Sequence, residues 1–168
     1  METKEVVKLL DSTFKAQGYI KAPQNTWVLQ MPETFIVFKV RTSAWSKLFY
    51  IDLGVVFKGL AQNQEMKKMK IEDVHIGHSL YNLFLTLGES QEYLEKLFSF
   101  DLSETEALDN ITAIWGLLKS KAMPYFEKLN DYKFLVENFK ENIAFNPFNV
   151  YFESPEYYVD FFERKLKT

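Results

Sequence analysis

The fold is decided by TFIVFKVRT at residues 34–42 and KLFYIDLGVVFK at residues 47–58. Successive side chains of a β-strand point to opposite faces of a sheet, so each stretch presents one apolar face. Ile36, Phe38 and Val40 share that face in the first stretch. Because the connection between the two stretches is short, we expect a hairpin in an antiparallel sheet with one packed face and one more polar face.

A helix and further strands are expected on both sides of this hairpin. Apolar residues at helical spacing predict a helix over residues 4–17, which Gly18 ends, and alternation predicts a strand over residues 26–31. Downstream, residues 61–70 are expected to form a loop or a short helical turn. Residues 73–82 alternate again and are expected to form a fourth strand.

Beyond these strands the apolar period becomes helical. Residues 90–98 fit either a short helix or a strand, but Ser103 and Glu106 form a capping box that predicts the start of a helix. The apolar stripe of that helix consists of Ala107, Leu108, Ile111, Trp115 and Leu118. We expect Trp115 to be buried against the sheet.

The C-terminal part of the sequence completes the expected architecture. Pro124 should break or bend the chain, and Asp131 can cap the next helix. Residues 148–152 alternate like a short edge strand, and Ser154-Pro155 predicts the start of a last helix. Strands in the first half and helices in the second predict a single α+β domain over residues 1–168, with an N-terminal helix, an antiparallel sheet of about four to five strands, and C-terminal helices packed on one face.

Composition bounds the class of protein. Of the 168 residues 47% are hydrophobic and 26% are charged, which excludes a disordered chain. No cysteine is present for disulfides, thiolate nucleophiles or cysteine-based zinc sites. No apolar run approaches the roughly 20 residues of a membrane helix, and the acidic start Met1–Glu5 is no secretory signal. We therefore expect a cytoplasmic protein that does not enter a membrane.

Charge is distributed unevenly along the chain. Residues 1–70 carry 11 Lys and Arg against 6 Asp and Glu, whereas residues 71–168 carry 9 against 17. The acids of the densest part, the acidic stretch 89–109, are Glu89, Glu92, Glu95, Asp101, Glu104, Glu106 and Asp109. An acidic protein has no general attraction for nucleic acid, but such a stretch can dock a basic partner protein. The alternative is an ordinary solvated face.

The sequence has no motif of a common enzyme class, neither a glycine-rich phosphate loop nor a G-x-S-x-G nucleophile motif. His75 and His78 have a spacing that can chelate a metal on a helix, but in the predicted strand they point to opposite faces. We therefore expect no metal and no cofactor. His78 is expected in the core, whereas His75 is the better candidate for contacting a ligand, with a structural role as the alternative.

The polar face of the predicted sheet is a more specific candidate site. It combines cations, hydrogen-bonding aromatics and a carboxylate, namely Lys39, Arg41, Tyr50, Asp52, His75, Ser79 and Tyr81. Such a mixture suits a groove that binds a polar ligand or a peptide. The alternative is an outer face that is solvated or covered by a helix.

Several short motifs resemble one protein family. They are IVFKVRTS at residues 36–43, FYIDLGV at residues 49–55, Gly18-Tyr19, His75-Ile76-Gly77 and Met123-Pro124-Tyr125-Phe126, and they are similar to those of a bacterial family described as domain of unknown function DUF4304. The resemblance spans most of residues 1–145. It implies the fold of that family and a soluble bacterial protein, and it implies no activity. Arg41 stands where the family favours a polar amide, and Gly77-His78 stands where an arginine is common.

The leading functional hypothesis is a non-enzymatic cytosolic binding or accessory protein that covers a partner, as immunity-type proteins do. It rests on the acidic stretch, the missing catalytic motifs and the single domain. Two alternatives stay open. One is a small enzyme or ligand-binding domain that uses the outer sheet face, and the other is a structural subunit whose exposed aromatics form a homodimer.

Overall fold

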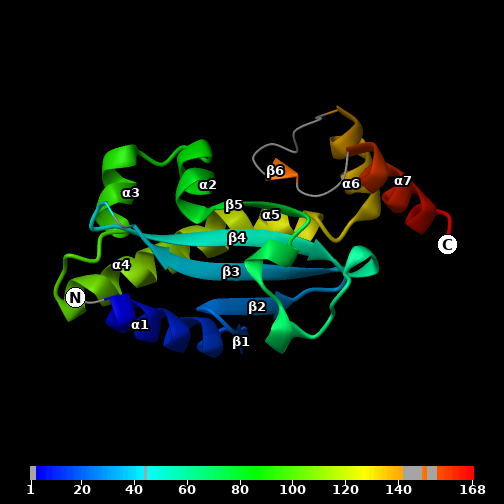
Figure 1. The fold of residues 1–168 in the computed structure, drawn as a ribbon. Helices are drawn as coiled ribbons and strands as arrows, with labels where there is room; N and C mark the ends of the chain where they lie inside the picture. Colours follow the sequence, from blue (N-terminus) through cyan, green and yellow to red (C-terminus); the bar gives the residue numbers. More distant parts are fainter. Residues whose placement is uncertain (1–2, 44, 142–148, 151–154) are drawn as a thin grey trace.

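The computed structural model describes residues 3–43, 45–141, 149–150 and 155–168 (Figure 1). The strands are β1 (Ile20–Ala22), β2 (Thr26–Gln30), β3 (Thr34–Thr42), β4 (Phe49–Phe57), β5 (Ile76–Ser79) and β6 (Asn149–Val150). The α-helices are α1 (Thr3–Ala16), α2 (Leu80–Thr86), α3 (Gln91–Leu97), α4 (Glu104–Leu117), α5 (Met123–Lys128), α6 (Tyr132–Glu141) and α7 (Pro155–Leu166). Between β4 and β5 the chain makes short 3-10 turns at Lys58–Leu60, Met66–Lys68 and Ile71–Asp73.

Each strand pairs antiparallel with the next one along the chain, so the sheet order is β1-β2-β3-β4-β5-β6. The hairpin of β3 and β4 forms its centre, with register from Thr34 opposite Phe57 to Thr42 opposite Phe49. The predicted bounds 34–42 match β3, and β4 starts two residues later than expected. The expected fold class is confirmed, with an N-terminal helix, an antiparallel sheet and C-terminal helices.

The main core lies between the sheet and the helices. The side chains on one face of the central hairpin are almost fully buried, and they are Ile36, Phe38, Val40, Phe49, Ile51, Leu53, Val55 and Phe57. They share one apolar cluster with Phe14 of α1 and Ile111 of α4, and α4 and α5 run behind the sheet in Figure 1. The alternation in residues 34–58 therefore identifies the buried face correctly.

Helix α1 ends at Gly18, as predicted. Gly18 has a φ of 84°, and its N–H donates to the Lys15 carbonyl while the Tyr19 N–H donates to the Phe14 carbonyl. This pair of bonds is a Schellman motif, in which the left-handed glycine satisfies carbonyls that the helix leaves unpaired. The indole Nε1 of buried Trp27 also donates to Asp11 Oδ1 at 2.8 Å, which joins β2 to α1.

The opposite face of the sheet, here called the outer face, has a smaller apolar cluster. Segment 58–75 crosses this face in Figure 1, and its Met69 and Val74 bury Val37 and Val56. The part of the outer face near the turn between β3 and β4 is polar instead. The outer face is therefore divided into a covered apolar part and an open polar part.

The strand predicted over residues 73–82 is too long at both ends, because Asp73 belongs to a 3-10 turn and β5 begins at Ile76. β5 ends at Ser79, whose hydroxyl accepts a hydrogen bond from the Asn82 N–H and so caps α2. Leu80, Leu83 and Phe84 are buried along that helix at a spacing of three and four residues. Residues 80–82 therefore fit both the alternation of a strand and the spacing of a helix, and the cap from Ser79 stabilises the helix.

Residues 90–98, which fit either a helix or a strand, form helix α3 with Ser90 as its N-cap. The three-residue strand β1 was not expected. In α4 the capping box of Ser103 and Glu106 is confirmed, but Leu108 is 46% exposed. The buried stripe of α4 and the turn after it consists of Ala107, Ile111, Ile114 and Leu118.

Trp115 is only half-buried, so its predicted burial is confirmed in part. Its ring contacts Phe14 and Tyr19 edge-on, with both centroid distances at 5.7 Å. Its Nε1 is buried and has no hydrogen-bond partner in the part of the chain that the structure describes. The apolar side of the ring therefore packs in the core while its polar atom remains unsatisfied.

Pro124 is expected to break or bend the chain, but the helical path continues through it. A π-helical turn, Leu118–Ala122, leads directly into α5, and Pro124 lies in the first turn of α5, where a missing N–H costs no helical hydrogen bond. Asp131 caps α6 as predicted, since its Oδ1 accepts from the Lys133 and Phe134 N–H groups. Of the predicted strand at 148–152, residues 149–150 are described and form β6, and Ser154 lies outside the described residues.

Candidate functional site

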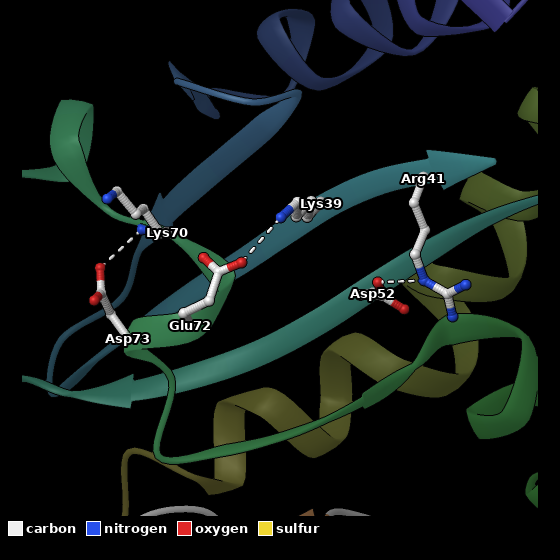
Figure 2. A network of polar contacts seen from close by, with 6 residues as sticks. All are labelled: Lys39, Arg41, Asp52, Lys70, Glu72 and Asp73. Carbon is white, nitrogen blue, oxygen red and sulfur yellow. Dashed lines mark hydrogen bonds and ion pairs between the residues drawn. The ribbon is translucent and has the colours of Figure 1, made fainter.

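The sheet register brings most of the predicted polar residues together on the outer face. Lys39 lies opposite Asp52, Arg41 lies opposite Tyr50, and Ser79 of β5 lies on the other side of Asp52. Directly opposed residues on neighbouring antiparallel strands point to the same face. Figure 2 shows Lys39, Arg41 and Asp52 along these two central strands.

Charged groups on this face are paired with one another. Arg41 Nε lies 2.6 Å from Asp52 Oδ2, and the Arg41 guanidinium carbon lies 4.7 Å from the centroid of the Tyr50 ring. Lys39 Nζ lies 3.0 Å from Glu72 Oε1 (Figure 2). The hydrogen bond from Lys39 is the main reason why the pKa of Glu72 is lowered. The outer face is therefore arranged as ion pairs with an aromatic ring beside them.

Tyr81 reaches the same surface from a different element than predicted. It lies in α2 instead of a strand, and its ring centroid is 6.0 Å from that of Tyr50. Burial raises the pKa of the Tyr81 hydroxyl, and the negative charge of Glu95 adds to the effect. Glu95 belongs to the acidic stretch 89–109, so the two candidate surfaces adjoin at Tyr81.

His75 does not join the polar group on the outer face, which corrects its predicted position. It precedes β5, its ring stacks on Phe57 with centroids 5.8 Å apart, and its Nδ1 accepts a hydrogen bond from the Phe57 N–H at 2.9 Å. Burial lowers the pKa of His75 to about 4. His78 lies opposite Leu53 and is half-buried, and burial lowers its pKa as well.

The turn between β3 and β4 presents a residue that sequence reasoning missed. Trp45 is 97% exposed. The Ser43 hydroxyl accepts hydrogen bonds from the N–H groups of Trp45 and Ser46 at 3.1 and 3.0 Å, which holds the backbone at these two residues. A tryptophan between two serines in a hairpin connection is a signal that could have identified it, because nothing in a short polar turn covers such a ring.

This turn lies beside the acidic stretch. Leu48 forms a β-bridge with Ser99, and hydrogen bonds of 2.9 Å join the Phe49 N–H to the Phe98 carbonyl and the Phe100 N–H to the Lys47 carbonyl. Lys47 also forms an ion pair with Asp101. The connection between α3 and α4 therefore fixes the position of the hairpin.

The seven acids of the stretch have different environments. Glu89 pairs with Lys121, Asp101 pairs with Lys47, and Glu106 accepts hydrogen bonds from Ser103 in the capping box. The exposed acids on the surfaces of α3 and α4 that make no ion pair with a described residue are Glu92, Glu95, Glu104 and Asp109. Four carboxylates therefore remain to give this end of the molecule a negative charge.

Strand register, the ring contact of Tyr50 with Tyr81 and the ion pair of Lys47 with Asp101 connect the elements that carry these residues, and we call the group the hairpin-end surface. It consists of Arg41, Trp45, Tyr50, Tyr81, Glu95 and Asp101. It combines the two surfaces that were predicted separately, the outer sheet face and the acidic stretch. Lys39, Asp52 and Ser79 border it on the sheet.

A cavity of about 800 Å³ lies elsewhere, between segment 58–75 and the first turn of α7. Val56 and Tyr158 contribute apolar walls, and His75, Lys70 and Tyr157 are among its polar lining residues. The described residues contain no cluster of three or more side chains suited to holding a metal ion. Within the same described ranges, no helix has the length and apolar character needed to cross a lipid bilayer.

Comparison with protein families identifies one match. A family model described as Domain of unknown function (DUF4304) matches residues 10–128, which is more than half of the chain. The match covers the second half of α1, the sheet through β5, and α2 to α5. No curated protein and no solved structure matches the chain.

Proposed function

We propose that this chain, which belongs to the DUF4304 family, is a non-enzymatic binding protein of the bacterial cytoplasm that docks a partner protein through the hairpin-end surface. The observation that carries the proposal is Trp45, a 97% exposed ring at the tip of the hairpin that also bears Arg41 and Tyr50. Tryptophan, tyrosine and arginine are the residue types that dominate binding energy at protein interfaces.

The energy available from Trp45 is large. An aromatic side chain buries about 150–250 Å² on removal from water, which corresponds to roughly 4–6 kcal/mol of apolar transfer free energy. The hydrogen bonds from the Trp45 and Ser46 N–H groups to the Ser43 hydroxyl restrict the backbone at these two residues, which reduces the conformational entropy that is lost on binding. A fully exposed tryptophan gives no such stabilisation to the fold itself, which favours a role in binding.

The charges around Trp45 favour a basic partner. Glu92, Glu95, Glu104 and Asp109 are exposed on α3 and α4, whose connecting segment pairs with the hairpin. Opposed charged patches accelerate encounter and orient the two proteins before apolar contacts form. Binding to a basic protein should therefore depend on salt mainly through its association rate.

The pairing of charges on the sheet favours binding over catalysis on this face. Asp52 is held by Arg41, and Lys39 is held by Glu72. A general acid or base must reach the substrate proton with its own atoms, so a group held in an ion pair is poorly placed for that task. Paired side chains of this kind instead give a partner a fixed pattern of donors and acceptors.

Comparative affinity capture tests the proposal. Wild-type protein, Trp45→Ala and Leu166→Ala are immobilised at equal density and exposed to a bacterial lysate, and captured proteins are quantified by mass spectrometry. Leu166 is a matched control because it is 51% exposed at the end of α7, far from the hairpin turn in Figure 1. We expect a basic protein that wild type and Leu166→Ala retain and Trp45→Ala loses. Equal capture by all three proteins would contradict docking at Trp45.

A further inference from the structure

The cavity between segment 58–75 and α7 lies apart from the hairpin-end surface and shares no residue with it. Its volume of about 800 Å³ falls in the range of small-molecule sites. It is partly open to solvent, and most of its lining residues carry polar or charged groups. Val56 and Tyr158 are buried residues in its wall, and the amides of Gln62 and Asn63 also line it.

His75 lines this cavity with a ring whose protonated nitrogen and plane are defined by its neighbours. Because its Nδ1 accepts from the Phe57 N–H, the neutral ring has its proton on Nε2. Stacking on Phe57 and contact with Tyr158, at centroid distances of 5.8 and 6.0 Å, fix the plane of the ring. Nε2 has no hydrogen-bond partner among the described residues, and it is not sealed inside the core as Trp115 Nε1 is.

Lys70 gives the cavity a cation that forms no ion pair with a described residue, although its charge contributes to the lowered pKa of Glu72. The acids beside it are engaged elsewhere, since Glu72 pairs with Lys39 and Asp73 Oδ2 accepts from the Lys70 backbone N–H (Figure 2). Lys68, which also lines the cavity, pairs with Glu65. No described carboxylate lies within ion-pair distance of the Lys70 ammonium.

We propose that this cavity binds a small organic anion, whose charged group meets Lys70 and whose acceptor atom meets the His75 Nε2–H. An anion would form the ion pair that Lys70 does not form with any described residue. It would also accept a hydrogen bond from the His75 Nε2–H, whose ring orientation is already fixed. The neighbouring carboxylates of Glu72 and Asp73 repel molecules with several separate anionic groups, so small molecules with one anionic group, a carboxylate or a phosphate monoester, are the favoured class.

Nuclear magnetic resonance titration tests this site. The probes are glycerol 3-phosphate and benzoate, with glycerol and benzamide as neutral counterparts at constant ionic strength, and the signals followed are the backbone amides of Lys70 and His75 and the imidazole Nε2. We expect at least one anion to bind saturably with a Kd below about 10 mM, while its neutral counterpart produces no saturable shift.

Three variants locate the binding. Lys70→Gln should weaken anion binding by about tenfold or more, because a charge-assisted hydrogen bond is lost. His75→Asn keeps the acceptor for the Phe57 N–H but removes the Nε2–H, and should weaken binding severalfold. Lys67→Gln is the matched control, since Lys67 lies in the same 3-10 turn as Lys68 but does not line the cavity.

Three results would overturn the site: saturation by neither anion, equal binding of a neutral counterpart, or equal weakening by Lys67→Gln and Lys70→Gln. Lys70 is exposed, so its variant remains informative even where His75→Asn is poorly folded. Trp45→Ala should leave anion binding unchanged, which separates this site from the proposed docking function.

Discussion

Val74 lies so close to Gly54 that a β-carbon at position 54 would come within 2.4–2.6 Å of three atoms of its side chain. Val74 belongs to the segment that crosses the outer face of the sheet, and it is 3% exposed. The absence of a side chain at position 54 in the central strand β4 is therefore what allows segment 58–75 to cover the apolar part of this face.

Gly54→Ala should accordingly destabilise the fold by about 1–3 kcal/mol, because the added methyl group overpacks a filled site. Gly116→Ala is the control. Gly116 is in α4, and no atom of the described residues beyond the helix itself lies within 4 Å of a β-carbon built there, so alanine should stabilise the helix by roughly 0.5–1 kcal/mol. Urea unfolding of both variants measures the two changes, and equal stability of Gly54→Ala and wild type would show that Val74 does not pack as described.

The buried imidazole of His75 should make stability depend on pH. Its pKa is about 4 in the folded protein, because burial penalises the charged ring, against about 6.5 in the unfolded chain. The unfolded state therefore binds the proton more readily, so the free energy of unfolding is highest above pH 6.5. It should fall by about 3 kcal/mol between pH 7 and pH 4 from this group.

His75→Asn should lack this component of the pH dependence. Lys68, Lys70, Glu72 and Asp73, which line the same cavity, remain in both proteins, as does His78. The difference between the two pH profiles of urea unfolding therefore isolates His75. Parallel profiles between pH 7 and pH 4 would contradict a buried neutral ring.

Trp115 packs its apolar ring in the core, and its buried Nε1 has no partner among the described residues, so substitutions by Phe and by Ala should affect stability differently. Trp115→Phe removes the unsatisfied N–H and keeps most contacts with Phe14 and Tyr19, and should change stability by less than about 1.5 kcal/mol. Trp115→Ala leaves a cavity and should cost about 3 kcal/mol. Thermal unfolding compares them, and similar losses for both would show that the ring does not contribute through packing.

The sequence predicts the central hairpin well because one physical rule governs it. Alternation in residues 34–58 places Ile36 and Leu53 in the core and Arg41 and Asp52 on the outer face, as observed. Tyr81 was misplaced because the chain changes from strand to helix at Ser79, where a single serine cap outweighs the local alternation. The residue at which a strand gives way to a helix can depend on one capping hydrogen bond, and the alternation of apolar residues does not reveal that bond.

The cavity and the hairpin-end surface depend on contacts between distant segments. His75 was expected on the outer face, but Val74 turns down onto Gly54 and leaves His75 beside Phe57. Likewise, the bridge between Leu48 and Ser99 joins the hairpin to the acidic stretch, and no local pattern encodes that pairing. Trp45 differs from these residues, because its exposure follows from its place in a short polar connection and needs no contact between distant segments.

The acidic end of the surface should control the rate of association with a basic partner. Reversal of charge by Glu92→Lys and Glu95→Lys together should slow association severalfold at low salt, and added salt should remove most of that difference. Both side chains are exposed, so stability should change by less than about 0.5 kcal/mol. Surface plasmon resonance at two salt concentrations measures this effect, and a change confined to the dissociation rate would contradict it.

The dissociation constant of Trp45→Ala for the purified partner is the most direct test of docking at the hairpin-end surface. Isothermal titration calorimetry compares wild type, Trp45→Ala and Leu166→Ala at one salt concentration. Docking through Trp45 predicts that Trp45→Ala binds about 30-fold or more weakly, equivalent to at least about 2 kcal/mol, while Leu166→Ala matches wild type. Equal dissociation constants for wild type and Trp45→Ala would contradict the proposed binding surface.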